Sequence, residues 1–300
     1  MSGARKAVVS VPATSANVGV GYDCLGIALD LRATFTFEES DELVIDGCLE
    51  KFRGEDNLAW TSYLEACRRM YREPRPMHLT IDSPIPLSGG LGSSSTCVVA
   101  GVVAAQLLNG DGFEPQAALN VATFLEGHPD NVAPAIMGGL VSSFSDGRDT
   151  RSLRFDVADG ISFVAIAPPY EVRTADARKV MPESVSTETC VWQVGHAVAT
   201  VQALQSGDCD LLSAACQDRL HEPFRARLIP DYEPLRRTAL AAGAAAFLIS
   251  GSGSTMLAVC DGDEGARRVA NAVNNMVENH IDGLWVRVLG CSPEGVTFEA

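Results

Sequence analysis

Alternating hydrophobic and polar residues mark several segments in the first half of the chain. Phe35 and Phe37 alternate with threonines, and HLTID near residue 80 repeats the pattern. A period of two is typical of a β-strand with one buried face. The sequence therefore predicts strands over residues 7–11, 27–31, 34–37 and 78–82, the first of them closed by Pro12.

Longer hydrophobic segments in the same half predict helices. Asn57 precedes such a segment and can cap a helix over residues 58–72. An apolar run over residues 97–108 predicts a buried helix, which the following Asn-Gly pair ends. Residues 116–126 predict a further helix, and the segment GHPDNVAPAIMGG after it is expected to be a loop.

The pattern changes in the second half, where the predicted order is strand, helices, strand, strand, helix, strand. This order fits a split β-α-β sandwich, with a hairpin around GSGST. SDGRDTRS breaks the apolar pattern between the halves, so we expect two domains, residues 1–155 and 156–300. The elements are strands over residues 162–167, 246–250, 256–260 and 284–289, and helical segments over 192–205, 232–242 and 263–279.

Composition narrows the class of protein. The 300 residues are 46% hydrophobic and 20% charged, an ordinary balance for a chain with a large core. The net charge of −15 repels phosphate backbones and anionic lipids. We therefore expect no nucleic-acid partner and no binding to a membrane surface.

The cysteines and the N-terminal segment predict a location. The sequence has nine cysteines and no C-x-x-C pair, and most of the cysteines have apolar neighbours. Such residues are typical of buried free thiols in a reducing compartment. MSGARKAVVSVPA lacks the apolar core of a signal peptide, and no run of about 18 apolar residues predicts a membrane span. We expect a cytoplasmic protein.

The glycine- and serine-rich segment PLSGGLGSSS, residues 86–95, directly precedes the predicted buried helix. Unpaired N–H groups at a helix N-terminus carry partial positive charge, and glycines let a phosphate approach them closely. Serine hydroxyls add donors or a Mg²⁺ ligand. The segment is neither a Walker A loop nor G-x-G-x-x-G. Taken alone, it fits a phosphate cradle and a flexible turn about equally well.

Two further segments favour the phosphate cradle. VPATSANVGVGYDCLG, residues 11–26, combines small residues with Asn17 and Asp23 after a predicted strand. LISGSGST, residues 248–255, places two glycines between serines, which by itself is also a plain tight turn. Three distant glycine-rich segments with polar side chains predict one shared site.

Together the three segments resemble the signature of the GHMP kinases, which act on galactose, homoserine, mevalonate and phosphomevalonate. VPATSANVGVGYDCLGIALDL and EGHPDNVAPA resemble the homoserine kinases in particular, and the match runs in order from about residue 8 to 260. The resemblance implies an α+β fold, with an N-terminal domain like ribosomal protein S5 and a ferredoxin-like C-terminal domain. It also implies a homodimer that uses ATP to phosphorylate the side-chain hydroxyl of L-homoserine in threonine biosynthesis.

The resemblance assigns the glycine-serine segment to the phosphates of ATP. It implies that Ser94 and Glu126 hold Mg²⁺, an ion that prefers oxygen ligands; a solvated helix-end carboxylate is the alternative for Glu126. Asn57 resembles the family's adenine-side asparagine, although a plain helix cap explains it nearly as well. The implied nucleotide-binding residues are Asn57, Pro86, Leu87, Ser88, Gly89, Gly90, Leu91, Gly92, Ser93, Ser94, Ser95, Gly251 and Gly253.

The resemblance also assigns residues to each group of homoserine. Asp23 would pair with the ammonium, and Arg178 and Arg225 with the carboxylate, since a guanidinium can donate two parallel hydrogen bonds. Surface ion pairing is the alternative for both arginines. Asn17 and Asn131 would orient the hydroxyl, and His128 either touches the substrate or fixes its loop. The implied substrate-binding residues are Asn17, Asp23, His128, Asp130, Thr174, Arg178 and Arg225, with Arg227 as a weaker candidate.

For the reaction, Asn131, Glu126 and Ser94 are the implied catalytic residues. Phosphoryl transfer depends mainly on positioning and charge neutralisation, because its transition state is loose. We therefore expect no strong protein base, with Asn131 holding the hydroxyl and the proton leaving late to phosphate. Asp130 as a general base is the alternative.

The chain departs from the usual consensus sequence of these motifs at a few positions. Val20 and Ser254 stand where proline is usual, Gly89 where arginine is common, and Ser95 and Thr96 replace smaller residues. The groups expected to touch phosphate or metal are all present, whereas the identity of the substrate is more open.

Other functions are weighed against this one. The first alternative is a GHMP kinase for another small alcohol, such as a different amino-alcohol; a substrate without a carboxylate would not need both Arg178 and Arg225. The second is a non-catalytic sensor, which would not need Glu126 and Ser94. The absence of G-x-S-x-G and H-E-x-x-H argues against a serine hydrolase and a zinc enzyme.

Overall fold

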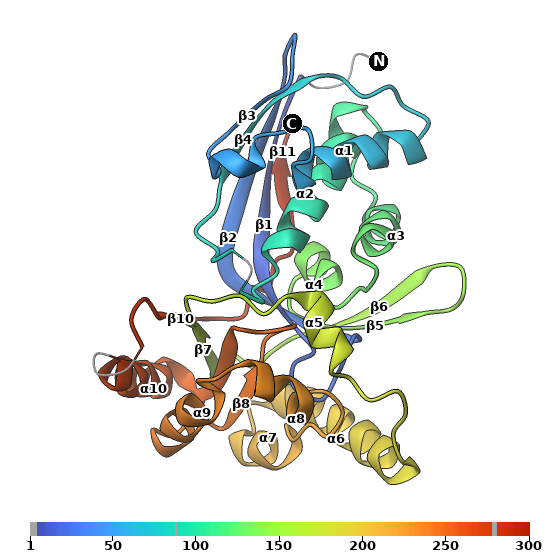
Figure 1. The fold of residues 1–300 in the computed structure, drawn as a ribbon. Coiled ribbons are helices and arrows are strands. Elements are labelled where there is room, and N and C mark those ends of the chain that lie inside the picture. Colours follow the sequence, from blue (N-terminus) through green and yellow to red (C-terminus); the bar gives the residue numbers. More distant parts are fainter. Residues whose placement is uncertain (1–4, 88, 278–280) are drawn as a thin grey trace.

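The computed structural model describes residues 5–87, 89–277 and 281–300. Figure 1 shows two sheet-and-helix units, the N-terminal one above and the C-terminal one below. The expected α+β fold is confirmed, with a seven-stranded sheet in the first unit and a four-stranded sheet in the second. Among the described residues, no helix is both long enough and apolar enough to cross a membrane.

The first sheet is built around two long antiparallel strands. Its order is β11-β1-β2-β4-β3, and a β5–β6 hairpin also pairs with β2. Only β3 runs parallel to its neighbour. The strands are β1 (Lys6–Ala16), β2 (Leu25–Glu39), β3 (Val44–Asp46), β4 (Met77–Asp82), β5 (Leu140–Ser145), β6 (Thr150–Phe155) and β11 (Thr297–Glu299).

These strands are longer than the sequence predicts. Pro12 was expected to end the first strand, but β1 continues to Ala16 and its register with β2 shifts between Pro12 and Ala13. A bulge of this kind tolerates a residue that has no N–H to donate. The predicted strands over residues 27–31 and 34–37 are one continuous strand, β2.

The helices of the first unit cover one face of this sheet (Figure 1). They are α1 (Leu58–Arg69), α2 (Ser93–Leu108), α3 (Pro115–Glu126) and α4 (Val132–Met137), with a short helix η1 (Glu50–Phe52). α2 is buried along most of its length, as its apolar sequence predicts. At Gly101 a Cβ would lie 2.3 Å from the carbonyl oxygen of Ala59, so only glycine allows α1 and α2 to pack this closely.

One expected loop is a helix. α4 forms within GHPDNVAPAIMGG, and Pro134 occupies its first turn, where a missing N–H is tolerated. Five of its six residues are buried. Burial against the sheet therefore stabilises a helix that is too short for sequence periodicity to detect.

The second sheet has the expected split β-α-β order. Its four strands run β10-β7-β9-β8, all neighbours are antiparallel, and the predicted hairpin is confirmed as β8–β9. The strands are β7 (Ile161–Ala167), β8 (Ala246–Ile249), β9 (Met256–Asp261) and β10 (Trp285–Leu289). The helices are α5 (Thr174–Lys179), α6 (Thr187–Ser206), α7 (Cys209–Ala215), α8 (Glu222–Arg225), η2 (Ala226–Leu228), α9 (Tyr232–Ala241) and α10 (Gly262–Val277).

The end of the chain does not stay with the second sheet. The expected boundary at residues 155/156 lies between β6 and β7, where the chain passes from one sheet to the other. However, β11 pairs with Val8–Ser10 of β1 in the first sheet. We therefore propose that the N-terminal domain also includes this last strand, although the sequence prediction gives residues 156–300 entirely to the second domain.

Candidate active site

A cavity of about 780 Å³ is lined by segments from both units. The end of β1, the start of α2, the loop between β8 and β9, and parts of α5 and α8 all contribute to its wall. Most of the predicted site residues therefore share one cavity. Those that line it are Asn17, Asp23, Asn57, Leu87, Gly89, Gly90, Gly92, Ser93, Ser94, Glu126, His128, Asp130, Asn131, Thr174, Arg178, Arg225 and Gly251.

Several predicted residues do not line this cavity. Leu91 and Ser95 are buried behind its wall, at 0% and 1% exposed, and Pro86 and Gly253 are also absent from the lining. Arg227 lies over the ring of Phe224 instead. Ser88 lies outside the described residues.

Two glycines of the glycine- and serine-rich segment, residues 86–95 (below, the phosphate loop), lie too close to the segments 11–26 and 248–255 to carry a side chain. Gly90 and Gly92 have φ of +94° and +68°, which side chains rarely adopt. A Cβ on Gly92 would lie 2.1 Å from the hydroxyl of Thr14, and one on Gly90 would lie 2.3 Å from the carbonyl oxygen of Ser250. The N-cap residue of α2 is Gly92, which has no side chain to bond the first N–H groups of the helix, so these groups remain available to a ligand.

Asn57 acts as a helix cap in the structure. Its Oδ1 accepts hydrogen bonds from the N–H groups of Ala59 and Trp60, at 2.9 and 3.3 Å, and its Nδ2 donates to Phe52 at 2.8 Å. This end of the cavity is otherwise mainly apolar, with a surface that suits a flat aromatic ring. Apolar residues that line the cavity include Leu49, Phe52, Leu58, Ile81, Ile85 and Leu87, of which sequence reasoning identified only Leu87.

Glu126 lies against the phosphate loop, but the serine that contacts it is Ser95. The Ser95 hydroxyl donates to Glu126 Oε1 at 3.0 Å, whereas the exposed Ser94 lines the cavity. The expectation that Ser94 and Glu126 together hold Mg²⁺ stays a prediction, and the contact with Ser95 is an additional feature that sequence reasoning did not identify. A carboxylate beside serine hydroxyls is a set of oxygen donors that fits Mg²⁺.

The loop before α4 supplies three polar residues to the cavity, in two separate hydrogen-bonded pairs. Asp130, 2% exposed, hydrogen-bonds through Oδ1 to Nδ1 of His128, and this bond raises the pKa of His128. The Thr14 hydroxyl donates to Asn131 Oδ1 at 2.8 Å. The Nδ2 group of Asn131 has no hydrogen-bond partner in the described part of the chain, so it is a free donor in the cavity wall.

Charged groups meet at the other end of the cavity. Arg178 donates two hydrogen bonds to Asp23, at 3.0 and 3.2 Å, and a third to the hydroxyl of Tyr22 at 3.2 Å. The buried Arg225 also donates to Tyr22, at 3.3 Å, and lies over its ring. Tyr22 therefore joins the two arginines, a role that the sequence gave no signal for.

Asn17 makes two hydrogen bonds within the protein. Its Nδ2 donates to the carbonyl oxygen of Gly251 at 2.9 Å, and its Oδ1 accepts from the N–H of Asp23 at 3.0 Å. Both functional groups of this buried side chain are thus engaged within the protein. Its expected role at the substrate hydroxyl stays a prediction, and Asn17 does line the cavity.

Glu222 connects α8 to the third motif. Its Oε1 accepts a hydrogen bond from the N–H of Ile249, the last residue of β8, at 2.7 Å. Burial and, next, the negative charge of Asp218 raise the pKa of Glu222 from 4.5 to about 8. This shift favours the neutral, protonated form of Glu222 near pH 7. A neutral Glu222 can lie close to Asp218 without repulsion between two negative charges.

Comparisons with known proteins match both halves of the chain. Residues 57–139 match the model of the GHMP kinases N terminal domain, and residues 200–279 match that of the GHMP kinases C terminal domain. The chain is 38% identical to a homoserine kinase of Clostridium botulinum (strain ATCC 19397 / Type A), over 83% of this chain and 84% of the relative. It is 39% identical to the homoserine kinase of Clostridium beijerinckii over 95% of both.

The fold of this chain also matches that of a solved homoserine kinase structure. The crystal structure of homoserine kinase from Cytophaga hutchinsonii superposes with a TM-score of 0.88 at 30% identity. The superposition covers 99% of this chain and 98% of that one. The likeness therefore extends over both sheets and the cavity between their loops.

Glu222 makes stability depend on pH. Because the folded chain holds a proton that the unfolded chain loses above its pKa of 4.5, the free energy of unfolding falls as pH rises toward 8. The slope approaches about 1.4 kcal/mol per pH unit. Glu222→Gln keeps an acceptor for Ile249 and has no proton to lose, so its slope should be flatter, as measured by urea unfolding between about pH 5 and about pH 8.

Glu233→Gln, which alters an exposed carboxylate on α9, is the control and should keep the wild-type slope. Equal slopes for the wild type and Glu222→Gln would show that Glu222 is not the titrating group.

Proposed function

Since the chain belongs to the homoserine kinase family of the GHMP kinases, we propose that it transfers the γ-phosphoryl group of ATP to the side-chain hydroxyl of L-homoserine. The product is O-phospho-L-homoserine, and the pathway is threonine biosynthesis. One observation carries the proposal: the glycine- and serine-rich loop before α2 and the Asp23–Arg178 carboxylate–guanidinium pair line a single cavity.

The Asp23–Arg178 pair suits the amino-acid end of the substrate. An α-amino acid carries an ammonium and a carboxylate on adjacent atoms, and these complement a carboxylate and a guanidinium that already lie side by side. Arg225 adds a second guanidinium, held in place by the carbonyl oxygen of Gly251 at 2.9 Å. An alcohol without a carboxylate would leave both arginines without their ligand.

The ligand atoms of Asp23, His128 and Asp130 lie within 4.8 Å of one another. The negative charge of the Asp23 and Asp130 carboxylates favours an ammonium near them. The same charge disfavours an additional phosphate there, so we assign the phosphates of ATP to the loop at the start of α2.

The reaction needs positioning more than a strong base. We propose that the free Nδ2 group of Asn131 donates to the substrate hydroxyl and directs its lone pair toward the γ-phosphorus. The N–H groups at the start of α2 would stabilise the transferred phosphoryl group. Asp130 is buried and hydrogen-bonds to His128, so we assign it to fixing this loop rather than to acting as a general base. The proton of the substrate hydroxyl then passes late to the transferred phosphate.

We propose that Glu126 and Ser94, which both line the cavity, hold Mg²⁺. The ion, when bound, neutralises charge on the phosphate oxygens. The chain's own part is to hold the Glu126 carboxylate in place through the buried hydroxyl of Ser95.

We also propose a cytoplasmic homodimer. All nine cysteines lie among the described residues and all are free thiols. Val191, Val194 and Val198 are each about two-thirds exposed and follow one another at helical spacing along α6, and none of them lines the cavity. An apolar stripe of this kind pairs well with its own copy across a two-fold axis.

The first test is ADP release from Mg·ATP by the purified protein, with L-homoserine, L-threonine, L-serine, mevalonate and galactose as acceptors. We expect turnover with homoserine well above the others, because only homoserine offers both charged groups and a hydroxyl at the right reach. Turnover only with another amino-alcohol would show that this alcohol, and not homoserine, is the substrate. ATP binding without any turnover would indicate a sensor.

Glu126→Gln tests the metal assignment. The amide keeps the hydrogen bond from Ser95 and removes the charge, so kcat should fall by about 100-fold or more, while KM for homoserine changes little. Steady-state kinetics over a range of Mg²⁺ concentrations measure this. Glu114→Gln, at the exposed other end of the same helix, is the control. Full activity of Glu126→Gln would rule out the assignment.

Val194→Glu tests the dimer. A charge in the middle of the valine stripe should convert the protein to a monomer in sedimentation velocity, because it would be buried without a partner at the interface. Asn271→Glu adds the same charge on an exposed face of α10 and should leave the dimer intact. If the wild type is itself a monomer, the proposal fails.

A further inference from the structure

The turn between β1 and β2 carries Asp23 in a conformation that side chains rarely adopt. Asn17, Val18 and Asp23 have φ of 70°, 43° and 56°, in the left-handed region, and Gly19 lies there too. Non-glycine residues remain in that region only where their surroundings hold them. Other groups must therefore fix this turn, and with it the position of the Asp23 carboxylate.

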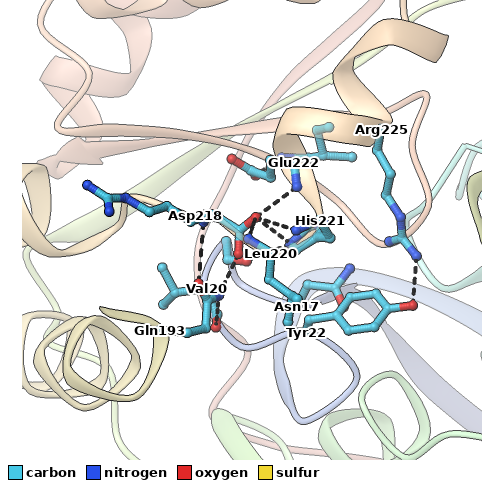
Figure 2. Close-up of polar contacts among 12 residues, drawn as sticks. Asn17, Val20, Tyr22, Gln193, Asp218, Leu220, His221, Glu222 and Arg225 are labelled. Carbon is cyan, nitrogen blue, oxygen red and sulfur yellow. Dashed lines mark hydrogen bonds and ion pairs between the residues drawn. The ribbon is translucent and has the colours of Figure 1, made fainter. Parts of the chain in front are cut away.

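Two side chains from the second unit hold the carbonyl oxygens of this turn (Figure 2). His221 Nε2 lies 2.6 Å from the carbonyl oxygen of Gly19, and Gln193 Nε2 donates to that of Val20 at 2.7 Å. His221 comes from the N-terminus of α8 and Gln193 from the middle of α6. The turn is thus anchored from outside by two separate elements.

Asp218 holds the backbone of His221 and the side chain of Gln193. Its Oδ2 accepts hydrogen bonds from the N–H groups of Leu220, His221 and Glu222, at 3.0, 2.7 and 2.8 Å. Its Oδ1 accepts from the same amide of Gln193 that reaches Val20. These bonds satisfy the buried carboxylate and make one rigid unit, the carbonyl brace, which consists of Gln193, Asp218 and His221.

The proton on His221 can be placed. A carbonyl oxygen only accepts, so Nε2 must carry the hydrogen. The side chain is 0% exposed and its Nδ1 has no partner in the described part of the chain. Burial also lowers the pKa of His221. The ring is therefore neutral and serves as a fixed donor rather than as an acid or base.

The brace leads directly to the residues for the amino-acid end of the substrate. The His221 ring stacks on Tyr22, with ring centres 5.3 Å apart. The Tyr22 hydroxyl accepts hydrogen bonds from both Arg178 and Arg225. Neither Gln193 nor His221 lines the cavity, and among the described residues none of the three hydrogen-bonds to the phosphate loop or to Glu126.

We propose that His221, supported by Asp218 and Gln193, is a positioning residue that sets the affinity for the ammonium and carboxylate of the substrate. It acts by holding the strained turn that presents Asp23 and Tyr22, and it does not touch the substrate. This inference rests on the proposed function, since it concerns the acceptor that the same cavity binds.

The test compares two substitutions of His221 by steady-state kinetics with L-homoserine and Mg·ATP. His221→Phe keeps the stacking on Tyr22 but loses the donor, so KM for homoserine should rise by about tenfold or more, roughly the effect of one lost hydrogen bond. KM for ATP and kcat at saturating homoserine should stay within about threefold. His221→Gln can place an amide donor near the former Nε2 and should recover most of the affinity.

Gln193→Leu gives an independent test if His221→Phe does not fold. It removes the bond to Val20 and leaves His221 in place, so KM for homoserine should again rise selectively. Gln217→Ala is the matched control, because this exposed side chain bonds only back to Ser213 of α7. Far-ultraviolet circular dichroism shows which variants are folded.

The outcomes separate the inference from the proposed function. If the wild type does not phosphorylate homoserine, the proposed function fails first. If it does, then an unchanged KM for homoserine in a folded variant overturns the role of the brace. An equal rise in KM for ATP also overturns it, because the brace would then support the whole cavity rather than one end.

Discussion

The structure depends on backbone hydrogen bonds that join three glycine-rich segments far apart in the sequence. Thr14 N–H donates to the carbonyl oxygen of Leu91 at 3.1 Å, and Thr255 N–H to that of Gly89 at 2.7 Å. The Ser250 hydroxyl donates to Gly90 at 2.6 Å. Main chains can meet this closely only where side chains are small or absent. These contacts hold the two sheets together at one place, and the cavity forms there.

This arrangement separates the groups that build the cavity from those that face a ligand. The glycines and the side chains of Asn17 and Asn57 are used within the protein, whereas Ser94, Asn131 and the arginines keep polar atoms in the cavity wall. Different parts of the protein also hold the two sets of cavity residues in place. The phosphate end is backed by the buried helix α2, and the charged end by the carbonyl brace from α6 and α8.

Much of the fold could be predicted because its strands and helices carry clear local patterns. The alternation around Phe35 and the apolar run that becomes α2 each depend on near neighbours alone. The failures have physical causes. β1 passes Pro12 because a bulge removes the need for its N–H, and α4 exists because the sheet buries it. The pairing of β11 with β1 joins residues almost 300 positions apart, and no local pattern encodes it.

By itself, the sequence determined the fold class, the motifs and the residues that come together, because each motif has a characteristic composition and order. Only the tertiary structure decided which atoms remain free. It gave the Glu126 carboxylate a hydrogen bond from Ser95, engaged both groups of Asn17 internally, and brought Tyr22, Gln193 and His221 together behind the charged end. The reason is that a side chain's availability depends on the hydrogen bonds it makes with distant segments, and those bonds are defined only once the chain has folded.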